Sequence, residues 1–337
     1  MDWLDDKDKI IEGAFAECYL KMHPMICIHG ILFTIDGIVS DESGIKNDIY
    51  SMVRPYVTSG LARKVEQLLQ TIKLEAYSEP LPLQTDRIHV ANGTLFLNGE
   101  FSEQKDFCLN RLPVIYDPDV EKPARWLKFM EELLNPDDIL TLQEYMGYML
   151  LPTTKAQKMM LIIGKGGEGE SRIGLVLREL FGNNMYSCSL QKIEVDKFAR
   201  ANLEYMLITV DDDMKLEALP QTNHIKSIVT LEDQIDLERK GQQSFQGVVY
   251  ARLIAFGNGG LHALYDKTDG FYRRQLILTT KDKVDGREDD PYLIDKLRKE
   301  RDGIFLWALE GLQRLVSNNY VFTESVDAKQ NLVDAQE

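Results

Sequence analysis

The spacing of apolar residues predicts a small, mainly helical region at the start of the chain. Apolar positions recur at helical intervals in residues 45–57 and 61–72, whereas residues 25–38 alternate between apolar and polar side chains. A proline-containing stretch at 78–85 then interrupts the pattern and is typical of a linker. We therefore expect residues 1–80 to form a helical accessory region.

The next part of the chain, residues 81–150, is expected to be a linker or collar region with a hairpin and two helices. Short apolar runs flank Asn92-Gly93, a dipeptide typical of a tight hairpin turn. Amphipathic patterns with helical spacing follow at 126–134 and 139–151. These helices lead directly into the third part of the chain.

Residues 151–320 contain apolar runs of strand length that are separated by helical and hairpin patterns. The runs lie at 159–163, 206–210, 252–256 and 275–278. Strands that alternate with helices predict an α/β fold with a mostly parallel sheet. Residues 321–337 are expected to form a polar tail.

Composition narrows the class of protein. A chain of 337 residues with 44% hydrophobic content is long enough for two or three domains. Its apolar runs are shorter than the roughly 20 residues that span a bilayer, and its acidic start has no signal pattern, so we expect a cytoplasmic protein without a membrane partner. The scattered cysteines indicate neither a zinc site nor a disulfide framework. The net charge of −15 argues against gripping duplex DNA by overall charge, but a narrow channel needs only a few lysines.

Residues 164–171 are the most informative segment. They match the phosphate-binding pattern G-x-x-x-x-G-K-[ST] at every fixed position except one, between an apolar run and an amphipathic stretch. In such a loop, backbone N–H groups point at phosphate oxygens, and the serine hydroxyl reaches a magnesium ion. The alternative is a glycine-rich turn without a nucleotide. The expected nucleotide-binding residues are Gly164, Gly166, Gly167, Gly169, Glu170, Ser171 and Arg172.

Glu170 stands where the pattern has lysine. A lysine meets the β and γ phosphates with a positive charge, whereas a carboxylate repels them. At an effective dielectric constant of about 20, two unit charges roughly 4 Å apart interact by ~4 kcal/mol, so the change of sign alters binding by several kcal/mol. The basic neighbours Lys165 and Arg172 do not have the position of the missing lysine. We therefore expect impaired ATP hydrolysis.

Polar residues also follow two of the predicted strands. Asp211, Asp212 and Asp213 follow an apolar run, and ligands bind at the carboxyl ends of parallel strands. One aspartate would hold magnesium and its neighbour would orient the attacking water, although three consecutive acids leave the register open and are also typical of a helix N-cap. Asn258 ends another strand and would position the same water; an ordinary Asn-Gly turn is the alternative.

Basic residues follow in two further places. Arg273 and Arg274 precede the last apolar strand and would reach an anion across a subunit boundary, unless they form a solvated or salt-bridged pair. Residues 237–246 predict a hairpin with Lys240 and Phe245 near its tip. Such a tip can hold a single strand by phosphate charge and base stacking, although an exposed turn explains it equally.

In this order, the motifs resemble those of the superfamily 3 helicases, a branch of the AAA+ ATPases. The resemblance is closest to the phage and poxvirus type primase-helicase proteins of mobile elements, and it covers roughly residues 85–318. Besides the ATPase motifs, it includes residues 112–118, Trp126, Phe129, 142–148 and 303–312.

The resemblance implies an AAA+ type P-loop ATPase core that binds ATP and Mg²⁺. Gly164 and Gly169 would hold the phosphates, and Ser171 and Asp212 would hold the metal. Asp213 would complete the Walker B pair. The family's members assemble as hexameric rings that hydrolyse ATP and unwind DNA.

The remaining roles implied by the resemblance concern the subunit boundary and the DNA. Asn258 resembles the sensor residue, and Arg274, beside Arg273, resembles the arginine finger given to the next subunit. Lys240 resembles the channel lysine that follows single-stranded DNA, with Lys226 assisting from a preceding helix.

The expected function is an ATP-dependent DNA helicase that replicates a phage or mobile genetic element in the cytoplasm of a bacterial host, impaired by Glu170. A primase or a replication-initiation protein is an expected partner, although residues 1–80 show no metal-binding acidic pair of a primase. The alternative is a non-hydrolysing ring or scaffold that binds DNA or replication partners. A small-molecule kinase is a third candidate, and the absence of a recognisable substrate-binding insertion counts against it.

Overall fold

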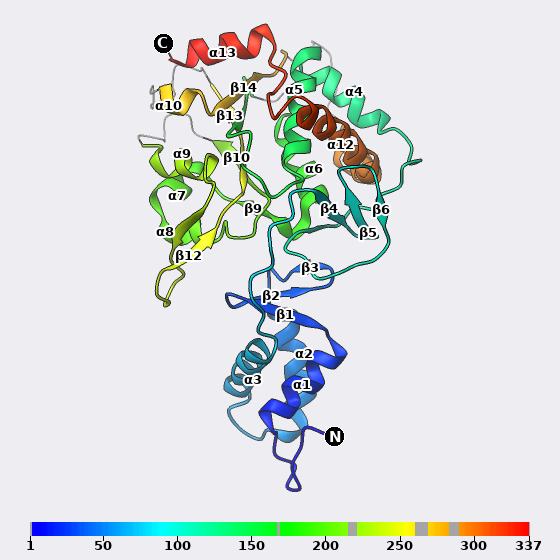
Figure 1. The fold of residues 1–337 in the computed structure, drawn as a ribbon, viewed down its shortest axis with the longest axis vertical. Coiled ribbons are helices and arrows are strands. Elements are labelled where there is room, and N and C mark those ends of the chain that lie inside the picture. The colour runs from blue at the N-terminus through cyan, green and yellow to red at the C-terminus, as the bar shows by residue number, and fades with distance from the viewer. Residues whose placement is uncertain (1, 167–168, 215–220, 260–268, 283–289, 337) are drawn as a thin grey trace. The chain divides into compact units, whose positions relative to one another are not determined.

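The chain divides into two compact units, which we call the N-terminal and the C-terminal unit. The computed structural model describes residues 2–166, 169–214, 221–259, 269–282 and 290–336. The N-terminal unit comprises Met1–Leu83 with Gln104–Arg111, and the C-terminal unit comprises Gln84–Glu103 with Leu112–Glu337 (Figure 1). Gly167, an expected nucleotide-binding residue, lies outside the described residues.

The N-terminal unit packs helices against a small antiparallel sheet. Its longest helix, α3, buries Val65, Leu68, Leu69 and Ile72, whose spacing places them on one helical face. The sheet accounts for the alternating pattern within a region expected to be mainly helical. The elements are α1 (Glu12–Met22), β1 (Met25–Ile28), β2 (Ile31–Thr34), β3 (Gly37–Ile38), α2 (Ser43–Val53), η1 (Arg54–Tyr56) and α3 (Leu61–Glu75).

Residues 87–112 contain a second small sheet, whose strands follow the order β6-β5-β4-β7. The predicted hairpin turn at Asn92-Gly93 joins its two central strands. Gly93 has a φ of 154°, and a Cβ there would lie 2.1 Å from the carbonyl oxygen of Ser102, so only glycine fits. The strands are β4 (Arg87–Val90), β5 (Gly93–Phe96), β6 (Phe101–Ser102) and β7 (Arg111–Leu112).

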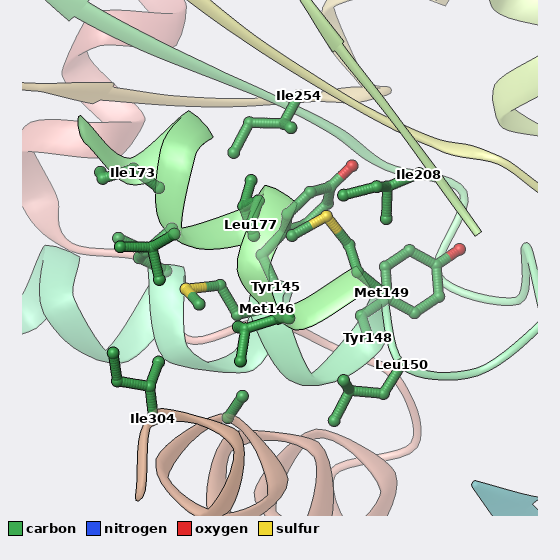
Figure 2. Close-up of a cluster of buried hydrophobic side chains, with 14 of the residues drawn as sticks. Tyr145, Met146, Tyr148, Met149, Leu150, Ile173, Leu177, Ile208, Ile254 and Ile304 are labelled. Carbon is green, nitrogen blue, oxygen red and sulfur yellow. The ribbon is translucent and has the colours of Figure 1, made fainter. Parts of the chain in front are cut away.

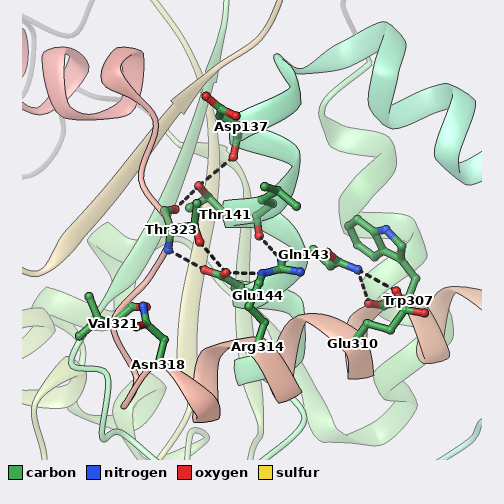
Figure 3. A network of polar contacts seen from close by, with 11 residues as sticks. Asp137, Thr141, Gln143, Glu144, Trp307, Glu310, Arg314, Asn318, Val321 and Thr323 are labelled. Atoms are coloured by element: carbon green, nitrogen blue, oxygen red, sulfur yellow. Dashed lines mark hydrogen bonds and ion pairs between the residues drawn. The ribbon is translucent and has the colours of Figure 1, made fainter.

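A close helix pair supports the central sheet. The second predicted collar helix, α5, packs on α12, and a Cβ on Gly311 would lie 2.2 Å from the carbonyl oxygen of Gln143. The buried Glu144 carboxylate accepts hydrogen bonds from Arg314 Nε at 2.6 Å and from the backbone N–H of Thr323 at 2.7 Å (Figure 3). The helices concerned are α4 (Ala124–Leu133), α5 (Pro136–Tyr148) and α12 (Arg301–Ser317).

The central sheet is parallel, with strands in the order β14-β8-β13-β10-β9. The predicted α/β fold with a mostly parallel sheet is therefore confirmed. The apolar runs predicted every strand except β9, whose 3 residues are too few to form a recognisable pattern. The strands are β8 (Met159–Gly164), β9 (Met185–Ser187), β10 (Ile208–Met214), β13 (Arg252–Asn258) and β14 (Gln275–Thr279).

Helices cover both faces of this sheet, since successive strand residues point to opposite faces. Met160 and Ile162 of β8 contribute to a core with α4, α5, α6 and α12, part of which Figure 2 shows. Met159, Leu161 and Ile163 contribute to the opposite core. Burial on both faces explains the continuous apolar runs. The remaining helices are α6 (Ser171–Phe181), η2 (Gly182–Asn184), α7 (Leu190–Val195), α8 (Lys197–Ala201), α9 (Asn223–Val229), α10 (Asp269–Tyr272), α11 (Leu293–Lys299) and α13 (Val326–Gln336).

The order of strands creates a topological switch point between β8 and β13. The chain leaves β8 through α6 towards β9 at one edge of the sheet, whereas it leaves β13 towards β14 at the other edge. Open α/β sheets bind ligands in the crevice outside the carboxyl ends of strands at such a point. The glycine-rich loop follows β8, and Asn258 ends β13.

Residues 321–337 were expected to be a polar tail, but most of them form α13, which packs on β14. Asn331 Nδ2 donates to the carbonyl of Ile277 at 3.2 Å, and the hydroxyl of Tyr272 donates to the carbonyl of Ala335. The sequence pattern hid this helix because its buried positions are small or polar. No helix in the described part of the chain is long and apolar enough to cross a bilayer.

Candidate functional site

The glycine-rich loop turns from the buried strand β8 into α6. Gly166 and Gly169 have φ values of 104° and 103°, in the left-handed region that favours glycine. Ser171 and Arg172 are exposed at the start of α6, where the helix dipole favours anions. The described residues on both sides of 167–168 are therefore suited to phosphate oxygens.

Glu170 does not fit that role. Its side chain is only 7% exposed, it makes no capping hydrogen bond to α6, and its Oε2 has no hydrogen-bond partner among the described residues. The ring of Phe129 from α4 lies beside the neighbouring Gly169. The chain thus holds a buried carboxylate where the phosphate-binding pattern requires a cation.

The end of β14 lies beside the loop, which the sequence did not indicate. The backbone N–H of Thr280 donates to the carbonyl of Ile163 at 3.0 Å. Further along the chain, Lys165 Nζ lies 2.5 Å from Asp282 Oδ1, and both side chains are exposed. Only the parallel pairing of β14 with β8 brings these distant residues together, so no sequence pattern could have found the ion pair.

The three aspartates of β10 differ in burial. Asp211 is buried, and its Oδ2 accepts a hydrogen bond from the backbone N–H of Leu190 at 2.8 Å. Burial raises the pKa of this carboxyl, although backbone hydrogen bonds act in the opposite direction. Asp212 and Asp213 are exposed and lie within a register shift between Asp211 and Met214. Asp211 therefore holds the start of α7, and the two expected Walker B residues are the accessible ones.

Asn258 and the loop meet at the carboxyl ends of the strands β13 and β8. Asn258 is the register partner of Gly164, and the backbone N–H of Gly259 donates to the carbonyl of Gly164 at 3.2 Å. Asn258 is exposed there. Because β10 is parallel to β13 and paired with it, Asp212 and Asp213 also lie at the carboxyl ends of the strands. The structure thus gathers the expected phosphate, metal and water-positioning residues around the switch point.

Arg273 and Arg274 lie at the opposite ends of the parallel strands, where β8 and β14 begin. They precede Gln275, whose register partner is Met159 at the start of β8. The length of β8, at about 3.3 Å per residue, separates them by roughly 15 Å from Gly164. Arg273 is exposed, whereas Arg274 is half-buried and donates to a carbonyl of α10. The structure does not bring this pair to the loop of its own chain.

The predicted hairpin consists of β11 (Gln234–Leu237) and β12 (Phe245–Val248), with Lys240 exposed in the turn. Phe245 was expected to offer its ring to a base, but the guanidinium of Arg239 lies 4.7 Å from the ring centroid. The expected stacking surface is therefore already covered on that side. Lys226 is half-buried on α9, the helix that precedes the hairpin in the chain.

Part of the chain matches a known sequence family. A family model described as a family of unknown function (DUF5906) matches residues 162–274. This stretch runs from the end of β8 to Arg274 and so contains the loop, the acidic strand, the hairpin and Asn258. No curated protein matches the chain.

Solved structures of the C-terminal region of NrS-1 in its apo form resemble the whole chain. Three of them have TM-scores of 0.61, 0.59 and 0.57 at 10%, 9% and 9% sequence identity. The matches cover 96%, 96% and 94% of this chain and 74%, 75% and 76% of those chains. At these identities the similarity establishes a shared fold.

Proposed function

We propose that this chain is the ATPase part of a DNA helicase that replicates a phage or mobile genetic element, with its hydrolysis impaired by Glu170. The main support is the pairing of Asn258 with Gly164 at the switch point, with Asp212 and Asp213 exposed on the next strand. Glycine backbone, exposed carboxylates and an amide are the groups that phosphate, Mg²⁺ and water require.

The chemistry of these residues suits Mg²⁺-ATP in all respects but one. Gly164 and Gly169 would hold the phosphates, and Ser171 and Asp212 would hold the metal ion, which neutralises phosphate charge when bound. Glu170 opposes binding by placing a negative charge in the same loop.

The position of the arginines supports a ring. Arg273 and Arg274 cannot reach the loop of their own chain, so their use in catalysis requires a second copy. We propose a hexamer that surrounds single-stranded DNA, with Lys240 directed at the phosphates and Lys226 assisting. We propose a primase or a replication-initiation protein as a partner of this ring.

The decisive experiment compares the chain with Glu170→Lys. We expect the variant to bind Mg²⁺-ATP at least about tenfold more tightly and to gain DNA-stimulated hydrolysis, since each 1.4 kcal/mol of removed repulsion is worth a factor of about ten. Glu17→Lys makes the same charge change on the exposed face of α1 and should change neither property. Equal, brisk turnover by both the chain and Glu170→Lys would refute the proposed impairment.

The burial of Glu170 favours one alternative, a non-hydrolysing ring or scaffold. In this alternative, Glu170 is a native feature, and the ring or scaffold functions without ATP turnover. In that case, Glu170→Lys would remain inactive while both forms bind single-stranded DNA with the same affinity.

A further inference from the structure

We infer that the ion pair between Arg239 and Glu204 fixes the hairpin turn and thereby holds Lys240 against the DNA backbone. The inference rests on the proposed function, because it requires Lys240 to contact DNA. Arg239 and Glu204 act here as positioning residues, and neither contacts DNA or nucleotide.

The acidic member of the pair, Glu204, is fully buried. The Glu204 side chain is 0% exposed, and Arg239 Nη2 donates to its Oε2, while the Arg239 side chain remains 22% exposed. The Arg239 guanidinium also lies 4.7 Å from the ring centroid of Phe245. A planar guanidinium that contacts both a carboxylate and an aromatic face has little freedom to move.

The strands of the hairpin pack directly on this carboxylate. A Cβ on Gly247 of β12 would lie 3.1 Å from Glu204 Oε1 and 2.5 Å from Leu237 Cδ1. Leu237, the last residue of β11, is itself buried in the core. The base of the hairpin is therefore fixed. The ion pair also fixes Arg239, which directly precedes Lys240.

Loss of the pair would release the turn because its acidic member cannot reach water. Removing one partner of a buried ion pair leaves an uncompensated charge, which is strongly unfavourable. Without Arg239, the buried Glu204 carboxylate loses its cationic partner, and the Tyr205 hydroxyl that is also hydrogen-bonded to it does not neutralise its charge. Without the charge of Glu204, the arginine loses the partner that holds it over Phe245.

The hairpin also offers an internal control. Lys197 Nζ of α8 lies 2.7 Å from Glu238 Oε2, one residue before Arg239, and the two side chains are 53% and 33% exposed. Exposed ion pairs of this kind contribute little. Breaking this neighbouring pair should therefore leave the turn in place.

The test measures binding of a fluorescent single-stranded oligonucleotide across a series of salt concentrations. All variants carry Glu170→Lys and are saturated with a non-hydrolysable ATP analogue. We expect Lys240→Ala to weaken binding and to lower the salt slope by roughly one unit for each phosphate that the lysine no longer neutralises. Glu204→Gln and Arg239→Gln should weaken binding to the same extent although Lys240 is intact, and Lys197→Gln should not.

Double variants separate positioning from a general loss of structure. Adding Lys240→Ala to Glu204→Gln should not weaken binding further, because the lysine has already moved away from the DNA backbone. Thermal melting establishes that each variant is folded. If Glu204→Gln fails to fold, Arg239→Gln is used in its place. Without DNA, a lysine-specific protease should cleave after Lys240 faster in either variant than in the Lys197→Gln control.

The outcomes distinguish this inference from the proposed function. If Lys240→Ala leaves affinity and salt slope unchanged, the proposed DNA contact is wrong. If Lys240→Ala weakens binding but Glu204→Gln and Arg239→Gln retain the parent's affinity, only the positioning role is wrong. Fully additive effects of Glu204→Gln and Lys240→Ala would also overturn it.

Discussion

Buried ionisable residues of the C-terminal unit differ in how their charge is compensated. Glu144 meets the guanidinium of Arg314, whereas the fully buried Arg252 donates to carbonyl oxygens, and burial lowers its pKa to about 10. Asp138 accepts a hydrogen bond, at 2.5 Å from the hydroxyl of Ser325, and its Oδ2 has no partner among the described residues. The Asp138 carboxyl therefore differs from that of Glu144, both of whose oxygens accept hydrogen bonds.

The pH dependence of stability should reveal this difference. Burial raises the pKa of Asp138 in the folded protein, so its favourable contribution is complete below its unfolded pKa and is lost as the pH rises through the folded pKa. Asp138→Asn keeps an oxygen that can accept from Ser325. We expect the variant to melt no earlier than the parent at neutral pH and to show a weaker decline between mildly acidic and neutral pH, measured by calorimetry.

Glu144→Gln is the matched control for that change. It also replaces a buried acid by its amide, but it leaves the guanidinium of Arg314 without its charged partner. It should lower the melting temperature at neutral pH. Equal destabilisation by Asp138→Asn and Glu144→Gln would contradict the distinction drawn between the two carboxylates.

At the scale of elements, the contact between α5 and α12 depends on the absence of a side chain. Gly311→Ala would place a Cβ 2.2 Å from the carbonyl oxygen of Gln143, and main-chain atoms cannot move away as a flexible side chain can. We expect a loss of about 1–3 kcal/mol in the free energy of unfolding, measured by denaturant titration. Gly13→Ala on α1, where an added Cβ would meet no other described part of the chain within 4 Å beyond its own helix, should instead be neutral or stabilise by about 0.5–1 kcal/mol.

The sequence predicted elements where local pattern and burial agree. The strands β8, β10, β13 and β14 contain apolar runs because both faces of the sheet are covered, and the Asn92-Gly93 turn follows from glycine's backbone freedom. The prediction failed where side-chain contacts, and not periodicity, determine the structure. The packing of α13 on β14 joins segments that are distant in sequence, and the contact of Arg239 with Phe245 within one hairpin depends on side-chain conformation.

The candidate site was predictable to a similar degree. The apolar runs showed that Asn258 and the aspartates follow strands, and the carboxyl ends of parallel strands lie together, so their shared location was predictable. The separate role of Asp211, which binds the N–H of Leu190, was hidden because three identical residues give no information about register. The pairing of Lys165 with Asp282 required the order of the strands.

At the scale of the whole molecule, the arginines and the loop lie at opposite ends of two adjacent strands, β14 and β8. Arg273 and Arg274 precede β14, and the loop follows β8, so parallel pairing separates the two by the length of a strand. In the proposed ring, a complete site combines the loop of one copy with the arginines of another. Glu170 would impair only the loop of its own copy and leave that copy's arginines available to its neighbour.

This arrangement predicts complementation between two inactive proteins. In the proposed ring, the parent chain would contribute Arg274 but an impaired loop, whereas the double variant Glu170→Lys with Arg274→Ala would contribute a restored loop but no arginine finger. Each should hydrolyse ATP slowly alone, and a mixture should hydrolyse it faster, because the parent lends Arg274 to the loop of the variant. Mixing the double variant with Arg274→Ala in the parent chain is the control and should give no gain. A mixture that is no faster than its components would show that Arg274 does not act across a subunit boundary.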